Sequence, residues 1–344
     1  MRRTGFGILL ACAAMAPLLL SSCRKELCYN HWEHSMSVKA DIRAVYGQEW
    51  ELDCGCAWED TWQTYGFNTG YDALRPGLPS GLKVLVYNPG GQYEEQNGAP
   101  EGFLVRMSEG EHSLLMYNND TEYLLFNDLG STATAVVTTR TRTRVPYSEE
   151  HRDEITVNAP DMLYSHYVEY WYGEKKLEAD ILDAGMKPLV FTYYIRCGFS
   201  SGAQYIRQAR GALSGMAAEV YLKDGSSSED VITVLFNEED CSVLADRVEA
   251  RVLSFGLPGF SGGSDEPVQD AGECFLTLDV ELRNGNVKSF KTDVTSQMLS
   301  QPRGGVILVD GLVITDEEGS ELGGGFDVDV DGWGDYEDVE IPVD

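Results

Sequence analysis

Short segments in which apolar and polar residues alternate recur along the chain, and this periodicity restricts its fold more than any other feature. Successive side chains of a β-strand point to opposite faces of the sheet, so such alternation over four to eight residues is typical of a strand. Alternating segments or short buried apolar runs occur at residues 38–45, 82–87, 103–105, 113–117, 123–126, 132–139, 166–171, 189–195, 217–222, 231–236, 250–255, 274–282 and 305–313. They predict an all-β protein.

Turn-forming sequences separate these predicted strands. Residues 88–91 read Asn-Pro-Gly-Gly, and residues 283–286 read Arg-Asn-Gly-Asn between two strand patterns, which is typical of a tight hairpin. Residues 203–213 form the best candidate for a helix, and the tryptophan-rich acidic stretch around residues 50–62 is expected to be a loop. Short strands separated by turns favour β-sandwiches.

The length of 344 residues is enough for about two domains. Residues 173–187 lack a clear strand pattern, so we expect the boundary there. The predicted domains are residues 28–180 and residues 181–344, and the second ends in acidic strands.

A large excess of acidic residues excludes some classes of partner. The chain has 26 Lys and Arg against 56 Asp and Glu, a net charge of −30. Nucleic-acid binding needs basic residues to replace the counterions of the phosphates, and docking on anionic lipid has the same requirement. We therefore expect no nucleic-acid partner.

The N-terminus has the pattern of a lipoprotein signal. Arg2 and Arg3 precede an apolar run at residues 7–20, which is too short to span a membrane. The run ends in Leu-Ser-Ser-Cys at residues 20–23, like the bacterial lipobox in which the cysteine is acylated. Residues 1–22 are thus predicted to be removed, and residues 23–27 to form an anchor segment with lipid on Cys23. Several acyl chains give stable anchoring.

The sequence contains no recognisable catalytic constellation. It has no metalloprotease helix, phosphate-binding loop or dinucleotide fingerprint, and acidic pairs are too abundant to be informative. Cys54-Gly55-Cys56, with His31 and His34 upstream, allows a zinc site, but a structural loop, bridged to Cys28 in one version, is the favoured interpretation. The chain is predicted not to be an enzyme and to need no cofactor, calcium excepted.

The acidic C-terminus allows two interpretations. Asp327, Asp329, Asp331, Asp335 and Asp338 have the spacing of an oxygen-ligand calcium loop, with Gly332 at the turn. The alternating valines instead favour a final β-hairpin whose aspartates face solvent. The hairpin is the favoured interpretation, and calcium is the alternative.

Phrases spread over the chain resemble a fimbrillin-like lipoprotein family of the Bacteroidales. They lie at residues 27–31 (LCYNH), 110–122 (GEHSLLMYNNDTE), 159–164 (APDMLY), 212–217 (ALSGMA), 292–295 (TDVT) and 325–333 (GFDVDVDGW). Each phrase is weak alone, but they occur in the family's order.

This resemblance implies two tandem transthyretin-like β-sandwich domains, export to the outer membrane as a lipoprotein, and kinship with subunits of surface pili. In polymerising fimbrillins an arginine-specific protease removes an early strand, and a strand of the next subunit fills the groove. Arg43, inside the first predicted strand, is the nearest candidate for such a cut.

The leading hypothesis is therefore a non-enzymatic surface lipoprotein: a pilus subunit, anchor or accessory protein in adhesion that assembles by strand donation. Its partners would be other pilus subunits or surface proteins, the outer membrane through Cys23, and a host or glycan ligand. The alternative is a glycan-binding outer-membrane lipoprotein whose tryptophans stack on sugar rings. The tryptophans concerned are Trp50, Trp58, Trp62, Trp171 and Trp333.

Overall fold

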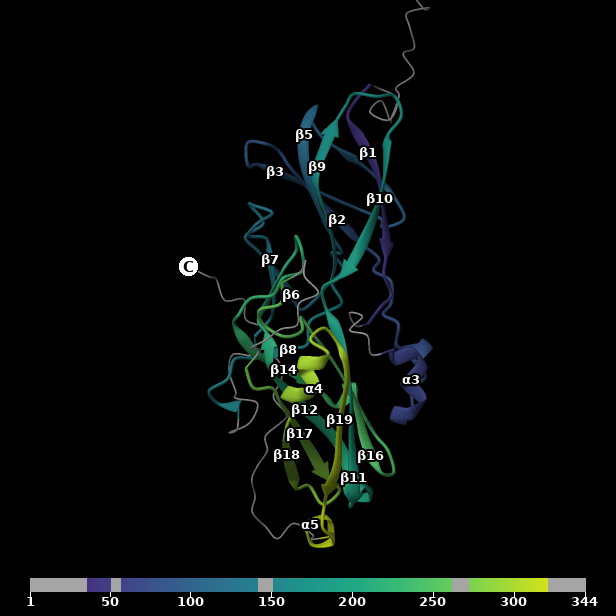
Figure 1. Cartoon of the computed structure of the whole chain (residues 1–344), viewed down its shortest axis with the longest axis vertical. Coiled ribbons are helices and arrows are strands. Elements are labelled where there is room, and N and C mark those ends of the chain that lie inside the picture. Colours follow the sequence, from purple (N-terminus) through teal and green to yellow (C-terminus); the bar gives the residue numbers. More distant parts are fainter. Residues whose placement is uncertain (1–35, 51–56, 142–150, 262–271, 321–344) are drawn as a thin grey trace, which may run out of the picture.

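Strands dominate the structure, a computed structural model that describes residues 36–50, 57–141, 151–261 and 272–320. The molecule is elongated, with one sheet system at the N-terminal end and a second around the C-terminal strands (Figure 1). The prediction of an all-β protein is confirmed. No helix in the described ranges is long and apolar enough to cross a membrane.

The N-terminal part is built on a seven-stranded sheet with the order β3-β2-β5-β9-β10-β1-β4. β9 and β10 pair at only two positions, Lys187–Ser165 and Pro188–Tyr164. The strands on either side of this junction, β3-β2-β5-β9 and β10-β1-β4, enclose one hydrophobic core. The bounds are β1 (Lys39–Tyr46), β2 (Leu82–Tyr87), β3 (Tyr93–Gly98), β4 (Phe103–Arg106), β5 (Gly110–Tyr117), β9 (Tyr164–Gly173) and β10 (Asp180–Pro188).

The other face of β2 and β5 is also buried. Leu85 and Leu115 point away from the first core into a second cluster. A three-stranded sheet supplies the opposite wall of that cluster, with the order β13-β7-β6. Its strands are β6 (Leu124–Asn127), β7 (Val136–Thr139) and β13 (Glu219–Tyr221). In Figure 1 β6 and β7 lie between the N-terminal sheet and the C-terminal strands.

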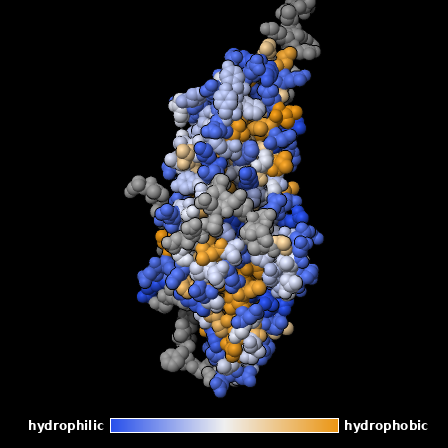
Figure 2. All heavy atoms as spheres, in the orientation of Figure 1, coloured by the Kyte–Doolittle hydropathy of each residue, from blue (hydrophilic) through white to orange (hydrophobic). Residues whose placement is uncertain are grey.

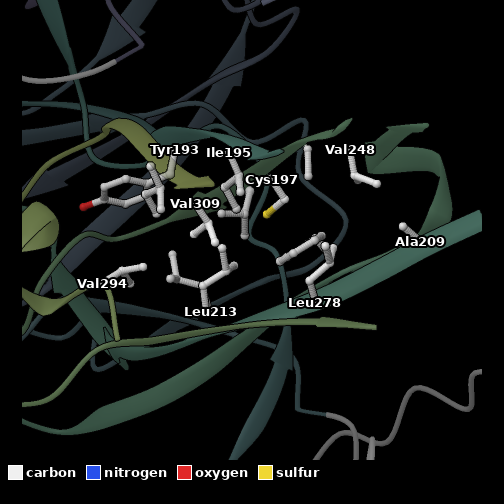
Figure 3. Close-up of a cluster of buried hydrophobic side chains, with 14 of the residues drawn as sticks. Tyr193, Ile195, Cys197, Ala209, Leu213, Val248, Leu278, Val294 and Val309 are labelled. Carbon is white, nitrogen blue, oxygen red and sulfur yellow. The ribbon is translucent and has the colours of Figure 1, made fainter. Parts of the chain in front are cut away.

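The C-terminal part is a sandwich of two sheets, ordered β15-β16-β11-β19 and β18-β17-β12-β14-β8. Side chains from both sheets, such as Ile195, Leu213 and Leu278, fill its core (Figure 3). The strands are β8 (Thr156–Asn158), β11 (Phe191–Ser201), β12 (Ile206–Ala217), β14 (Val231–Phe236), β15 (Cys241–Val243), β16 (Arg247–Ser254), β17 (Phe275–Leu282), β18 (Val287–Asp293) and β19 (Gly305–Val313). The predicted hairpin at residues 283–286 joins β17 to β18.

Chain segments cross between the two sheet systems. The division expected between residues 180 and 181 falls at the start of β10, which pairs with β1 in the N-terminal sheet. The C-terminal sandwich instead begins with β11, and β8 joins it from earlier in the chain by pairing with β14. The division into two transthyretin-like domains stays a prediction.

The prediction of a helix at residues 203–213 is wrong. A single 3-10 turn, η3 (Ala203–Tyr205), precedes β12, which pairs with β14 and β17 as an inner strand. Ile206, Ala209 and Leu213 have spacings that a helix also gives, but the neighbouring strands supply the hydrogen bonds instead. Gly211 suits this position because a Cβ there would lie 2.2 Å from the Phe236 ring.

The stretch around the first tryptophans contains a helix, contrary to the expected loop. Helix α3 (Trp58–Tyr65) places Trp58 and Trp62 on one face, and Gly66 ends it in the left-handed conformation with a φ of 68°. The remaining short elements are η1 (Tyr71–Leu74), η4 (Glu238–Asp240), α4 (Thr295–Ser300) and α5 (Asp316–Ser320).

An aromatic cluster fastens α3 and the chain after β1 to the C-terminal sandwich. Trp50 contacts Tyr194 of β11 edge to face, with ring centroids 5.1 Å apart, and Trp62 lies 5.6 Å from the same ring. The Trp50 carbonyl also accepts a hydrogen bond from the Thr192 amide at 2.8 Å. Aromatic pairs of this geometry add stability beyond the area they bury. The segment after β1 therefore joins the two sheet systems.

Replacing Trp50 with alanine should lower the free energy of unfolding by about 3–5 kcal/mol, since Trp50 is only 2% exposed and anchors this cluster. Guanidinium denaturation followed by circular dichroism would measure the change. Tyr170→Ala is the control, because Tyr170 is 62% exposed and its loss should change stability by no more than about 0.5 kcal/mol. A loss below about 1 kcal/mol for Trp50→Ala would contradict the proposed anchoring.

Candidate functional site: strand β1 and its groove

β1 is the strand that precedes all others in the described chain, and it lies inside the sheet. It runs parallel to β10 from Ala40, opposite Asp180, to Tyr46, opposite Met186. On its other side it pairs antiparallel with β4, from Lys39 opposite Arg106 to Ile42 opposite Phe103. Removing β1 would leave two strand edges facing each other across a groove one strand wide.

The inner side chains of β1 form part of the N-terminal core. Ala40 and Ile42 are fully buried, and they pack with Val105 of β4 and with Ala184 and Met186 of β10. A groove without β1 would therefore expose apolar surface as well as unpaired backbone. The unpaired backbone and the exposed apolar surface are both unfavourable. Both therefore favour filling the groove with a strand that places small and branched apolar residues at alternate positions.

Arg43, the predicted cleavage residue, lies on the outer face of β1. Its guanidinium donates to the carboxylate of Asp41 at 2.7 Å, and its side chain is 45% exposed. The peptide bond after it is less accessible, because the Ala44 amide donates to the Pro100 carbonyl at 2.8 Å and β10 pairs along the other side. A protease can thus reach the side chain, but the backbone must open before it can be cut.

Two tyrosines, of which Tyr164 is fully buried and Tyr46 partly buried, lie at the end of the groove. The rings of Tyr46 and Tyr164 meet edge to face with centroids 5.1 Å apart. Among the described residues, neither hydroxyl has a hydrogen-bond partner. Burial raises the pKa of Tyr164 to about 12, with a further contribution from Glu49, and burial raises that of Tyr46 to about 12.

The outer edges of the seven-stranded sheet meet through a side chain that sequence reasoning missed. Gln96 of β3 donates to the Arg106 carbonyl of β4 at 2.6 Å and accepts from the Arg106 amide at 2.9 Å. Its amide thus takes the place of a backbone pair and joins the two ends of the sheet. Gly98 has no side chain to oppose this approach, since a Cβ there would lie 2.1 Å from the Phe103 ring. A half-buried glutamine in a polar strand gives no sequence signal of this role.

The tryptophans of the glycan alternative are mostly covered. Trp50, Trp58 and Trp62 are buried in the aromatic cluster, with exposed fractions of 2%, 8% and 2%. Trp171 of β9 packs against the N-terminal core, and Trp333 lies outside the described residues. The three buried rings therefore offer no face on which a sugar could stack.

A histidine–carboxylate pair was not singled out from the sequence. His151 contacts Glu154 through Nδ1 at 2.7 Å and the Thr277 hydroxyl through Nε2 at 3.2 Å. Burial opposes ionisation of Glu154, but hydrogen bonds from Thr233 and His151 outweigh it, and the pKa of Glu154 lies below its usual value. Thr277 is 1% exposed in the middle of β17, so no substrate can approach its hydroxyl. The arrangement stabilises the sheet.

Several predicted site residues lie outside the described residues. They are Cys23, the cysteines Cys28, Cys54 and Cys56, and the aspartates Asp327, Asp329, Asp331, Asp335 and Asp338. Over the described ranges, no group of three or more His, Cys, Asp or Glu is placed to hold a metal ion. Cys197, Cys241 and Cys274 are free thiols.

Ile42→Ala should make cleavage after Arg43 at least about tenfold faster under an arginine-specific protease. Removing this buried side chain costs about 2–5 kcal/mol, and every 1.4 kcal/mol raises the open population about tenfold where cleavage follows local opening. Mass spectrometry would follow the fragment that begins at Ala44. Val45→Ala is the matched control on the same strand, since Val45 is 58% exposed. Equal rates for both variants would show that packing of β1 does not protect the bond.

Tyr164→Phe should reduce the loss of stability at high pH. An unfolded tyrosine ionises near pH 10, whereas the pKa of Tyr164 in the folded protein is about 12. Its contribution is therefore complete below about pH 10 and is lost as the pH rises through 12. Urea denaturation between about pH 9 and pH 11.5 would show a shallower decline for the variant than for the wild type. An unchanged decline would mean that Tyr164 ionises normally.

The comparisons with known proteins agree with this architecture. Residues 73–237 match the family model described as a domain of unknown function, DUF5119. No curated protein matches the chain. The solved structure of a candidate adhesin from Bacteroides ovatus is 18% identical, with 86% of this chain and 99% of that chain covered and a TM-score of 0.55.

Two further structures are less similar. The fimbrial anchor protein Mfa2 from Porphyromonas gingivalis is 10% identical, covers 79% of this chain and 90% of its own, and has a TM-score of 0.43. A candidate polysaccharide-binding protein from Bacteroides thetaiotaomicron is 9% identical, covers 80% and 92%, and has a TM-score of 0.47. The Bacteroides ovatus structure shares the fold, and residues 73–237 carry the family match. Residues 73–237 thus match the DUF5119 model, and the chain has an all-β fold similar to that of the Bacteroides ovatus structure, in line with the resemblance seen in its sequence.

Proposed function

We propose that this chain is a non-enzymatic surface lipoprotein that takes part in adhesion as a pilus subunit, anchor or accessory protein. The observation that carries the proposal is the position of β1: an N-terminal strand of eight residues seated between two other strands, with its inner side chains in the core. An N-terminal strand so placed can be exchanged for a strand of another subunit. The names of the similar structures, candidate adhesins and a fimbrial anchor protein, support the same role.

The surface is consistent with a secreted protein that works outside the cell. On the face shown in Figure 2 hydrophilic residues predominate, and hydrophobic side chains gather in small patches. The net charge of −30 keeps such a surface soluble and repels anionic lipid. Attachment to a membrane would therefore depend on the acyl chains of Cys23 rather than on the protein surface.

The proposed anchor also gives an orientation. β1 begins at the end of the molecule remote from the C-terminal sandwich (Figure 1). The chain between Cys23 and Met36 can span at most about 45 Å, since an extended residue covers about 3.5 Å. The N-terminal sheet would stay close to the outer membrane, and the C-terminal sandwich would project away from it.

The same geometry supports assembly by strand donation, which is part of the proposal. If a protease cuts after Arg43, the product begins at Ala44 and keeps Trp50, which holds the following segment on the C-terminal sandwich. The severed part of β1 can then leave without unfolding the rest of the chain. A donated strand with alternating apolar residues would restore the pairs to β10 and β4.

Mass spectrometry of the protein from its native envelope should find one of two N-termini. Lipid on Cys23 with β1 retained identifies an anchor or accessory protein, and a start at Ala44 in the pilus fraction identifies a polymerising subunit. Cys23→Ala should release the protein from the outer-membrane fraction, because no other anchor is proposed. Arg43→Ala is the matched variant. It should prevent formation of the N-terminus at Ala44 and leave the lipidated Cys23 unchanged. An unlipidated, uncut protein absent from both the membrane and pilus fractions would contradict the proposed function.

A further inference from the structure

The outer edge of β19 could accept a further strand. Among the strands that the structure describes, β19 pairs only with β11 and is the last strand of its sheet. Its first five residues, 305–309, are uncharged and mostly buried. An apolar edge without charge is a template for pairing with another chain.

Two glutamines cover this edge. Gln301 donates to the Val306 carbonyl at 2.7 Å and accepts from the Val306 amide at 2.8 Å. Gln297 makes the same pair of contacts with Leu308, at 3.0 Å and 2.8 Å. Val306 and Leu308 are alternate residues, and such residues present their backbone groups to the same side of a strand. The two amides thus take the place of a neighbouring strand.

The local structure places both amides. Gln297 lies in α4 and Gln301 follows its last residue, so they are four positions apart and lie on one face of the helical turn. Figure 1 shows α4 beside the first part of β19. Gly305 allows the close approach, because a Cβ there would lie 2.0 Å from Oε1 of Gln301.

The rest of the edge is protected by charge. Asp310, the next alternate residue, pairs at 3.0 Å with Arg196 of β11, the strand on the paired side of β19, so the charges at the outer edge come from the residues after it. Beyond it, Lys288 donates to the Val313 carbonyl at 3.0 Å and pairs with Glu318 at 2.6 Å. A second chain that approached β19 would have to bury these charges, which is unfavourable. The glutamines are therefore the part of the protection that covers the apolar half of the edge.

We propose that Gln297 and Gln301 prevent β19 from pairing with β19 of a second copy of this chain. The apolar half of β19 can form an antiparallel pair with the same segment of a second copy, related by a two-fold axis. Each copy then supplies the hydrogen bonds that the glutamines now make. Closing this edge removes one competitor of the β1 groove for strand exchange, a consequence that rests on the proposed function. The protection of the β19 edge by the two glutamines does not depend on that function.

The double variant Gln297→Ala/Gln301→Ala tests the proposal in the full-length mature chain. Sedimentation at several protein concentrations would report association, and hydrogen exchange would report the amides of Val306 and Leu308. We expect concentration-dependent dimers. At low concentration both amides should exchange about tenfold faster than in the wild type, and in the dimer they should regain protection.

Gln208→Ala is the matched control. Gln208 lies on β12 and donates to the Glu281 carboxylate at 2.6 Å, so its loss removes a glutamine hydrogen bond without opening an edge. The control and the wild type should both remain monomeric. A folded double variant that stays monomeric, or that dimerises while both amides remain unprotected, would overturn the proposal.

If the double variant does not fold, the single variant Gln297→Ala tests the proposal instead. Gln301, the more buried of the two glutamines, then stays in place. This single variant should expose the Leu308 amide and associate more weakly than the double variant. An unchanged exchange rate at Leu308 would overturn the proposal. None of these measurements uses pili or membranes, so failure of the proposed function would not affect them.

Discussion

The part of the N-terminal sheet formed by β2 and β5 is apolar on both faces, and the rest of the structure depends on covering both. Val84, Leu114 and Met116 face one core, whereas Leu85 and Leu115 face the other. Burial of apolar area is the main favourable term in folding, so each face needs its own covering layer. β10, β1 and β4 cover the first face, and β6, β7, β13 and the chain around Val190 cover the second.

The need to cover the first face makes β1 important for the N-terminal core. In the described part of the chain, the covering layer on the first face has three strands with β1 in the middle, so the core depends on this early segment. A strand in that position is held by hydrogen bonds on both sides, to β10 and to β4. The strand donation proposed above would replace β1 by a strand that restores these same hydrogen bonds and side-chain contacts.

Unpaired strand edges are the second constraint on this structure. Side-chain amides cover such edges in two places. Gln96 joins β3 to β4, and Gln297 with Gln301 covers β19, in each case by the donor and acceptor pair that a backbone would supply. A glutamine amide has the same donor and acceptor groups as a peptide bond. It can therefore complete a strand edge without offering a further edge to another chain.

Sequence periodicity determined the fold class and many of the strands, because alternation within a segment is a local property. β2, β14 and β19 have the predicted bounds, and the tight hairpin follows from its Asn-Gly turn. β12 was misread because the spacing of Ile206, Ala209 and Leu213 fits a helix as well, and only its two neighbouring strands select the extended form. Of the candidate site, the sequence identified Arg43 and its place in a strand. The strands beside it, the burial of the three tryptophans and the glutamine contacts were decided by the tertiary structure, because each depends on residues far away in the chain whose approach no local pattern encodes.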